Sequence, residues 1–186
     1  MPTENLYTGK HVHLTVPDPD TDVETESLWS HTADYDALLR TEVKRPVSVH
    51  RLKKRYEDAA KEPQNDAEFD FRIRLNEDER LVGELKLWAD WALSDAWMNL
   101  GIGLPGDRRK GFGSDALRLT TRYVFDELNL RRITTAIPGY NEAALAFLTR
   151  HGFKVEVRSR EALFRFGRRW DSLGLGLLRA DWEALR

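Results

Sequence analysis

The chain has 186 residues, of which 41% are hydrophobic and 32% are charged, with both signs mixed along the sequence. These proportions exclude a disordered chain and predict one folded domain over residues 1–186. The net charge of -2 indicates no dominant basic face, so we expect no nucleic-acid partner. We also expect no membrane span, because no window approaches the roughly 20 apolar residues that one needs.

The chain has no cysteine, which excludes disulfides, thiolate metal sites and a cysteine nucleophile. His11 and His13 share one face of a predicted strand but lack a third ligand, so we expect no metal site. The first ten residues are polar and lack the apolar stretch of a secretory signal. A cytoplasmic location is therefore the expectation.

In the first half, the hydrophobic pattern predicts a short strand, a helix and a hairpin. Apolar and β-branched residues predict a strand over 11–15, and a three- and four-residue apolar spacing predicts an amphipathic helix over 47–60. Residues 69–75 alternate between apolar and charged, a polar turn follows at 76–79, and a second strand covers 81–88. These two strands predict an antiparallel hairpin.

In the second half, predicted strands alternate with helices. The strand over 98–104 has one apolar face, whereas Asn99, Gly101 and Gly103 leave its other face almost bare of side chains. The remaining predicted elements are a helix over 114–128, a strand over 133–137, a helix over 141–150 that Gly152 ends, strands over 153–157 and 173–178, and a terminal segment around Trp182. Together they predict an α+β, or layered α/β, domain around a mixed sheet.

The glycine-rich segment has features of two nucleotide-binding patterns, and neither fits its context. Gly101-Ile102-Gly103-Leu104-Pro105-Gly106 matches the dinucleotide pattern G-x-G-x-x-G after a strand. No helix opens at its third glycine, however, and the acids about 20 residues on, Asp126 and Glu127, fall within a predicted helix. A phosphate loop of the Walker type is excluded because no Gly-Lys-Ser/Thr occurs.

A stronger pattern is Arg108-Arg109-Lys110-Gly111-Phe112-Gly113-Ser114, between a strand and a long helix. Its glycines let consecutive backbone N–H groups turn toward one point, the helix N-terminus adds partial positive charge, and the basic side chains add full charges. A pyrophosphate is the ligand that this chemistry favours. The alternative is a basic, flexible loop that binds no ligand.

One strand later the chain carries Asn141-Glu142-Ala143-Ala144 and Gly152-Phe153. Arg-x-x-Gly-x-Gly followed by Asn-x-x-Ala and Gly-Phe resembles the GNAT superfamily of acyl-CoA-dependent N-acyltransferases. The ending, with Trp170-Asp171 and Trp182, is similar to the branch that includes ribosomal-protein N-terminal and polyamine acetyltransferases. The resemblance is clearest over 81–182. It implies a mixed, mostly antiparallel sheet of about seven strands flanked by helices, with a splayed central pair of strands.

The resemblance also implies where acetyl-CoA, the expected co-substrate, is bound. Pantetheine would lie in the splayed gap as if it were an added strand, with Gly101 and Gly103 making room for it, and Asn141 would bond to it. For both residues there is an alternative role without a ligand: Asn141 can be an ordinary helix N-cap, and Arg150 can be a surface residue near a helix C-terminus. The expected cofactor-binding residues are Ile102, Gly103, Leu104, Arg108, Arg109, Lys110, Gly111, Phe112, Gly113, Ser114, Asn141 and Arg150.

An amine must lose a proton before it attacks a thioester, usually to a carboxylate or a water chain. Glu84 is the candidate base, and an exposed carboxylate without a role is the alternative. Asn99 stands close to the position where polyamine-acetylating relatives often carry Glu. Many members of the family carry a tyrosine acid at the position that Leu148 occupies here. Tyr140 is a candidate acid, although it stands eight residues before that position.

The sequence therefore predicts an N-acetyltransferase that moves an acetyl group to a small amine or a protein N-terminus by direct attack in a ternary complex. The alternative is a catalytically weak acyl-CoA-binding sensor. The resemblance alone implies a homodimer. The identity of the acceptor stays open, since variable N-terminal helices and loops shape that pocket.

Overall fold

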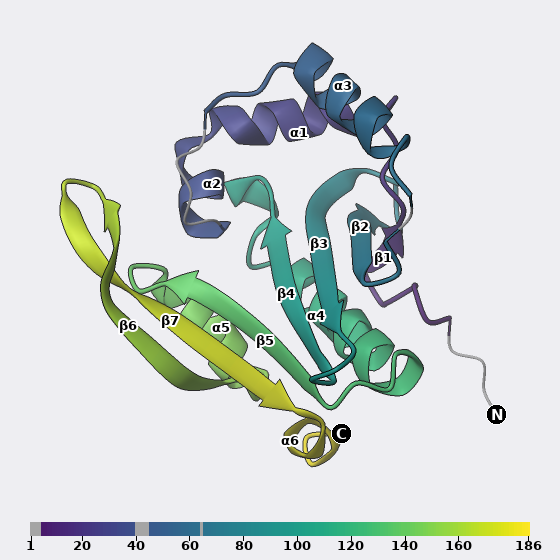
Figure 1. Ribbon diagram of the computed structural model, residues 1–186. Helices are drawn as coiled ribbons and strands as arrows, with labels where there is room; N and C mark the ends of the chain where they lie inside the picture. The colour runs from purple at the N-terminus through teal and green to yellow at the C-terminus, as the bar shows by residue number, and fades with distance from the viewer. Residues whose placement is uncertain (1–4, 40–44, 64) are drawn as a thin grey trace.

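The computed structural model describes residues 5–39, 45–63 and 65–186. Its centre is a seven-stranded sheet with the order β1-β2-β3-β4-β5-β7-β6 (Figure 1). All neighbouring strands are antiparallel except β4 and β5, which are parallel. The strands are β1 Val12–Thr15, β2 Glu68–Leu75, β3 Leu81–Asp90, β4 Asp95–Ile102, β5 Arg132–Pro138, β6 Lys154–Arg165 and β7 Arg168–Leu178.

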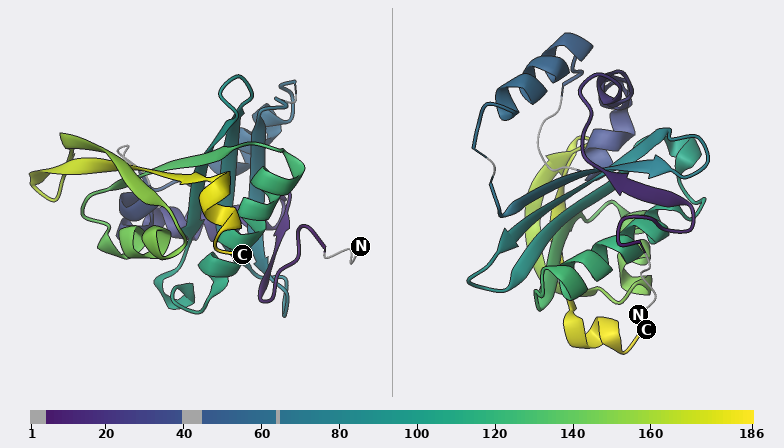
Figure 2. Two further views of the ribbon diagram at one scale, coloured as in Figure 1. Left: turned by 90° about the horizontal axis from the view of Figure 1, so that it is seen from below. Right: turned by 90° about the vertical axis from the view of Figure 1, so that its right-hand side faces the viewer.

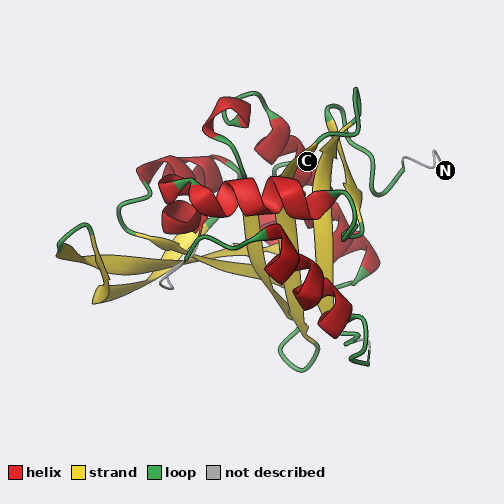
Figure 3. Cartoon of the chain, turned by 90° about the horizontal axis from the view of Figure 1, so that it is seen from above, coloured by secondary structure: helices red, strands yellow, loops and turns green. Residues whose placement is uncertain are grey.

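Helices cover both faces of this sheet. The helices are α1 Asp22–His31, α2 Ala33–Leu39, α3 Val49–Ala59, α4 Phe112–Arg122, α5 Glu142–Arg150 and α6 Arg179–Glu183, with a 3-10 turn at Pro105–Asp107 and a π-helical turn at Tyr123–Glu127. The N-terminal helices α1 to α3 lie across one side of the sheet (Figure 3). On the other face, α4 packs on β1 and β4, and α5 packs on β6. No helix of the described residues is long and apolar enough to cross a membrane.

The main core lies between the sheet and α4. Ile73, Leu85 and Leu117 are almost fully buried there, and Phe125 packs on Trp182 with ring centroids 5.0 Å apart. Burial of each large apolar side chain contributes about 1.5–3 kcal/mol. The opposite face of β2 to β4 is polar. Side chains alternate between the two faces of a strand, so Arg72 and Arg74, the neighbours of inward-facing Ile73, point toward the N-terminal helices. The mixed, mostly antiparallel sheet predicted from the sequence is confirmed.

The central strands part, as predicted. β4 and β5 pair only from Asp95↔Arg132 to Trp97↔Thr134, and beyond this register they diverge. The N–H of Gly103 donates to the carbonyl of Val82 at 2.9 Å. Since successive residues of a strand direct their backbone groups to opposite edges, the N–H and C=O groups of the even-numbered residues 98–102 face β5. The parting of the strands therefore exposes a backbone edge to a gap.

Three parts of the fold differ from the sequence prediction. The strands predicted over 153–157 and 173–178 are longer and form a hairpin, β6–β7, that projects from the rest of the chain (Figure 2). Most residues of β6 are exposed and do not alternate between apolar and polar along its whole length. The sequence pattern therefore did not predict how far the strand extends. The hairpin turns at Phe166 and Gly167, whose φ values of 55° and 74° suit a tight two-residue turn.

The helix predicted over 114–128 begins earlier and changes type. It starts at Phe112 and passes into the π-helical turn at Tyr123–Glu127, where the N–H of Leu128 donates to the carbonyl of Tyr123.

Helix α2 was not predicted at all. A seven-residue helix shows barely two turns of periodicity, although Tyr35, Leu38 and Leu39 do have the spacing of one helical face.

Candidate functional site

A groove of about 900 Å³ follows the gap between β4 and β5. Its walls come from α2, β4, the loop before α4, β5 and α5. The predicted site residues that line it are Asn99, Ile102, Arg108, Arg109, Gly111, Gly113, Ser114, Asn141 and Arg150. The structure thus brings most of the residues predicted for the cofactor to one groove.

The loop before α4 presents backbone donors to one end of this groove. Arg109 and Gly111 have φ values of 61° and 89°, so the chain turns sharply twice within three residues. Gly111 is the N-cap of α4, and its carbonyl accepts the first intrahelical bond, from the N–H of Asp115 at 3.0 Å. The N–H groups of residues 112–114 therefore have no intrahelical acceptor, and they form the positive end of the helix dipole.

Ion pairs hold this loop in place. Arg80 donates two hydrogen bonds to Asp107, at 2.7 and 3.0 Å, and Lys110 lies 3.7 Å from the same carboxylate. The hydrogen bonds from Arg80 hold the pKa of Asp107 below its ordinary value. Lys110 does not line the groove, because its ammonium points toward Asp107 at the outer side of the loop.

Arg108 connects the loop to the strand and to α2. Its guanidinium donates to the carbonyls of Ile102 and Gly103 at 3.3 and 2.9 Å, and it lies 3.3 Å from the carboxylate of Asp34. Gly103 and Leu104 lie beside the groove rather than along it. Phe112 is also outside its lining, and its ring lies 6.4 Å from that of His11.

The bare face of β4 is covered by this chain's own helices. A Cβ atom at Gly101 would lie 2.9 Å from the side chain of Leu39, and one at Gly103 would collide with the ring of Trp29. The two glycines therefore accommodate α1 and α2, a different physical reason from the room for pantetheine that the sequence suggested.

Asn141 has the capping role expected of it. Its side-chain oxygen accepts the N–H of Ala144 at 3.0 Å and so caps α5, while its amide group donates to the carbonyl of Leu38 at 2.9 Å. The neighbouring hydroxyl of Tyr140 donates to the carbonyl of Ala37 at 2.5 Å. Tyr140 does not line the groove.

Glu84 is 6% exposed and lies on the polar face of β3, between Arg72 and Gly101 in the register of the sheet. Arg72 also bonds to Glu26 and to the hydroxyl of Tyr56, at 2.6 and 2.5 Å. Burial raises the pKa of the Glu26 carboxyl against the opposing effect of Arg72, and nearby Glu84 raises it further. Glu84 thus belongs to a buried charged cluster next to the groove and does not line it.

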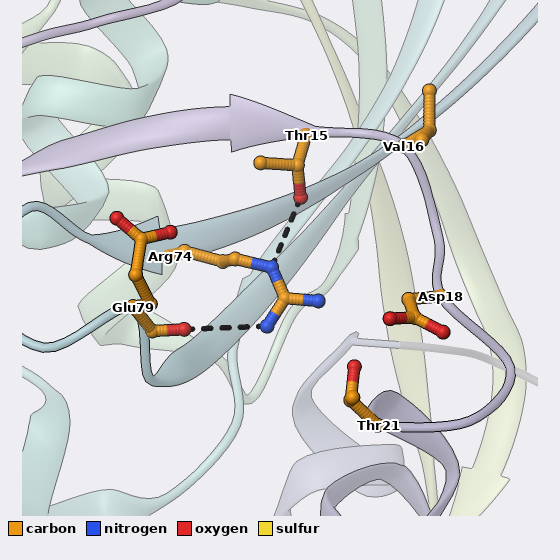
Figure 4. Close-up of a pocket in the computed structure, with 6 residues that line it drawn as sticks. All are labelled: Thr15, Val16, Asp18, Thr21, Arg74 and Glu79. Carbon is orange, nitrogen blue, oxygen red and sulfur yellow. Dashed lines mark hydrogen bonds between the residues drawn. The ribbon is translucent and has the colours of Figure 1, made fainter.

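A second, smaller hollow of about 280 Å³ lies between β1 and α1 (Figure 4). Arg74 at its centre donates to the hydroxyl of Thr15 at 3.1 Å and to the carbonyl of Glu79 at 3.3 Å, and it pairs with Asp22 at 2.5 Å. These partners belong to the chain itself. The hollow therefore marks where α1 is attached to the sheet.

Parted central strands next to a glycine-rich helix N-terminus are the geometry that the sequence resemblance implied, and a comparison of sequences decides the family. The family model for the Acetyltransferase (GNAT) domain matches residues 14–154. The chain belongs to the GNAT acetyltransferase family. The predicted enzyme class, an N-acetyltransferase, is thereby confirmed.

Similar proteins agree with this assignment. The GNAT chain is 29% identical over 139 residues to the "Probable N-acetyltransferase YjcK" of Bacillus subtilis (strain 168), covering 73% of this chain and 76% of that protein. It is 24% identical over 180 residues to the prophage-derived uncharacterized N-acetyltransferase YokL of the same organism, covering 95% of each. The fold matches the crystal structure of spermidine N-acetyltransferase from Vibrio cholerae in complex with CoA and spermine, with a TM-score of 0.80 and 20% identity over 92% of this chain and 98% of that one.

Helix α2 contributes residues to this GNAT groove that were not predicted from the sequence. These lining residues are Asp34, Tyr35, Leu38 and Leu39. The pair between Arg80 and Asp107 was not predicted either. The helical spacing within 35–39 was the available signal for α2, whereas nothing local in the sequence joins Arg80 to a carboxylate 27 positions away.

Proposed function

We propose that the protein transfers the acetyl group of acetyl-CoA to a primary amine, of a small molecule or a protein N-terminus, by direct attack in a ternary complex. The observation that carries this proposal is the groove itself, which runs from the exposed backbone edge of β4 to the free N–H groups of α4. Acetyl-CoA supplies an activated thioester. The protein's part is to bind it, to orient the amine and to remove a proton.

The groove supports a division of binding roles. The N–H groups of residues 112–114 and the side chain of Arg109 would hold the pyrophosphate, with Gly111 allowing its close approach. Arg150, at the exposed C-terminal end of α5, would reach the nucleotide phosphates. Of the backbone groups predicted over Ile102 to Leu104, those of Ile102 remain our proposed contact for the pantetheine arm, together with Asn141, because the N–H and C=O of Gly103 are bonded to Val82 and Arg108.

Glu84 and Asn99 remain our candidates for handling the amine. Both lie on the same face of the sheet, because Glu84 pairs with Gly101 and Asn99 is two residues before it on β4. Asn99 lines the groove and can orient an amine, while Glu84 lies deeper and can receive its proton through water. Tyr140 remains a candidate acid only if its hydroxyl leaves the carbonyl of Ala37.

The charges along the groove favour an acceptor with a single amine. Among the described lining residues, Asp34 is the only acidic one, and it faces Arg108 at 3.3 Å. A polyamine carries several positive charges at neutral pH and would need more carboxylates than this. The spermidine acetyltransferase that shares the fold is therefore a guide to architecture, and a peptide N-terminus or simple amine is our preferred acceptor.

The test is a thermal-shift titration followed by a thiol-release assay. Acetyl-CoA should raise the melting temperature, since a ligand at 100 times its Kd stabilises the native state by about 2.7 kcal/mol, and NAD should have less effect. Thiol release should then depend on an added peptide or amine. Binding without release for any acceptor would favour the sensor, which the buried position of Glu84 makes the second candidate. Tighter binding of NAD would contradict both.

We further propose that the chain forms one domain over residues 1–186 and acts as a cytoplasmic homodimer. The continuous seven-stranded sheet supports a single domain, and the absence of cysteine suits a reducing compartment.

A further inference from the structure

Two side chains from a distant part of the chain donate hydrogen bonds to backbone carbonyls near the C-terminal end of α2. The last carbonyls of a helix have no intrahelical donor and need partners from elsewhere. Near the end of α2, the carbonyl of Ala37 accepts the hydroxyl of Tyr140 at 2.5 Å, and the carbonyl of Leu38 accepts the amide of Asn141 at 2.9 Å. Two consecutive side chains thus hold two consecutive carbonyls.

The same two residues contact two further elements. Asn141 caps α5 through the N–H of Ala144. The ring of Tyr140 meets the rings of Phe166 and Trp170 edge-on, with centroids 5.4 and 5.2 Å apart. Tyr140 and Asn141, which follow the end of β5, therefore connect α2, α5 and the β6–β7 hairpin.

The elements joined here are walls of the groove. Asp34, Tyr35 and Leu39 of α2 line the groove together with Asn99, and Asp34 also lies 3.3 Å from Arg108 of the loop before α4. A helix of seven residues is not stable alone in water, so contacts with the rest of the chain determine where α2 lies. Besides the two hydrogen bonds, Tyr35 packs on Trp29 at 5.3 Å between ring centroids.

We infer that Tyr140 is a positioning residue for the acceptor: its hydroxyl holds α2 in the place where this helix and Asn99, our candidate for orienting the amine, line the groove together. This inference rests on the proposed function. Through its neighbour Asn141, the same attachment continues into α5, whose Arg150 also lines the groove. Loss of the hydroxyl would loosen α2 and leave in place the N-terminus of α4, which Tyr140 does not contact.

The first test needs no acceptor. Amide hydrogen exchange of α2 is compared in the wild type, Tyr140→Phe and the matched control Tyr123→Phe, which removes a tyrosine hydroxyl from the ring cluster of Tyr7 and Phe71 on the far face. We expect α2 amides to exchange about five- to tenfold faster in Tyr140→Phe only, the size expected for one net hydrogen bond. Equal exchange in all three proteins would overturn the inference.

The second test separates positioning from proton transfer. With acetyl-CoA and tetra-alanine as acceptor, Tyr140→Phe should raise the acceptor KM about five- to tenfold, with kcat, the KM for acetyl-CoA and the shape of the pH profile unchanged. A fall in kcat with loss of the alkaline limb would instead show that Tyr140 is an acid, and the inference would be wrong. If the wild type binds no acetyl-CoA in calorimetry, the proposed function fails, while the exchange result still decides whether Tyr140 holds α2.

Discussion

Gly111 has a positive φ and lies at the N-cap of α4, where we propose that the pyrophosphate binds. Its φ of 89° is costly for residues with a side chain, although Asn and Asp tolerate this region better than others. Around it there is room, since an added Cβ would lie no closer than 3.8 Å to His11. At the N-cap of α4, a carboxylate would stabilise the helix but would repel a bound pyrophosphate.

Gly111→Asp and Gly111→Asn should therefore separate charge from shape. We expect Gly111→Asp to bind acetyl-CoA at least about tenfold more weakly than Gly111→Asn, because the carboxylate faces the phosphates, while its melting temperature without ligand is equal or higher. Isothermal titration and thermal melting measure the two quantities. Gly106→Asp, at a position with open space around it, is the control and should bind normally. Equal affinity of the two Gly111 variants would place the phosphates elsewhere.

At this scale the sequence predicted local chemistry well and distant contacts poorly. The glycines and basic residues of the loop are adjacent in the sequence, so their chemistry was visible there. The bonds of Arg108 to Ile102 and Gly103, and of Asn141 to Leu38, depend on how the chain folds back on itself. No periodicity or motif records such contacts.

At the scale of elements, a single carboxylate joins β1 to α4. Asp115, in the first turn of α4, accepts the N–H groups of His11 and Val12 at 2.7 and 3.1 Å and pairs with Arg118 at 3.0 Å. Burial acts to raise the pKa of Asp115, but the backbone hydrogen bonds outweigh it and the pKa lies below its ordinary value. The ionised form is therefore the one that the native state stabilises.

The stability that Asp115 contributes should depend on pH in a defined direction. Because its pKa is lowered on folding, the contribution is present above the unfolded pKa of about 3.9 and is lost as the pH falls through the folded value. Asp115→Asn should lower the free energy of unfolding by about 2 kcal/mol at pH 7, and the difference from the wild type should shrink below about pH 4. Urea unfolding over this range measures it, with exposed Glu57→Gln on α3 as the control. A constant difference at all pH values would contradict the assignment.

Across the whole molecule, the order of elements and the parted central strands agree with the fold that the resemblance implied. Helix α2 and the full β6–β7 hairpin do not follow from the sequence, for opposite reasons. Short α2 takes its position from Tyr140 and Asn141, far along the chain, and β6 lies so exposed that no apolar face marks it. The positions of both elements therefore depend on contacts with residues far away in the sequence or on exposed residues without a pattern, and local sequence does not predict them.

At the scale of the assembly, we expect two copies of the chain to associate through β6. β6 is one of the two edge strands of the sheet, and Val157, Phe164 and Phe166 on its hairpin are 57%, 68% and 70% exposed. Exposed strand edges and apolar side chains are normally covered in native proteins, and a second copy related by a two-fold axis can pair β6 with β6. Light scattering should give twice the chain mass of 21.6 kDa. Phe164→Asp should shift this toward the monomer, whereas Leu93→Asp, 61% exposed in the β3–β4 turn, should not. A monomeric wild type would refute the homodimer, and a dimer that survives Phe164→Asp would place its interface elsewhere.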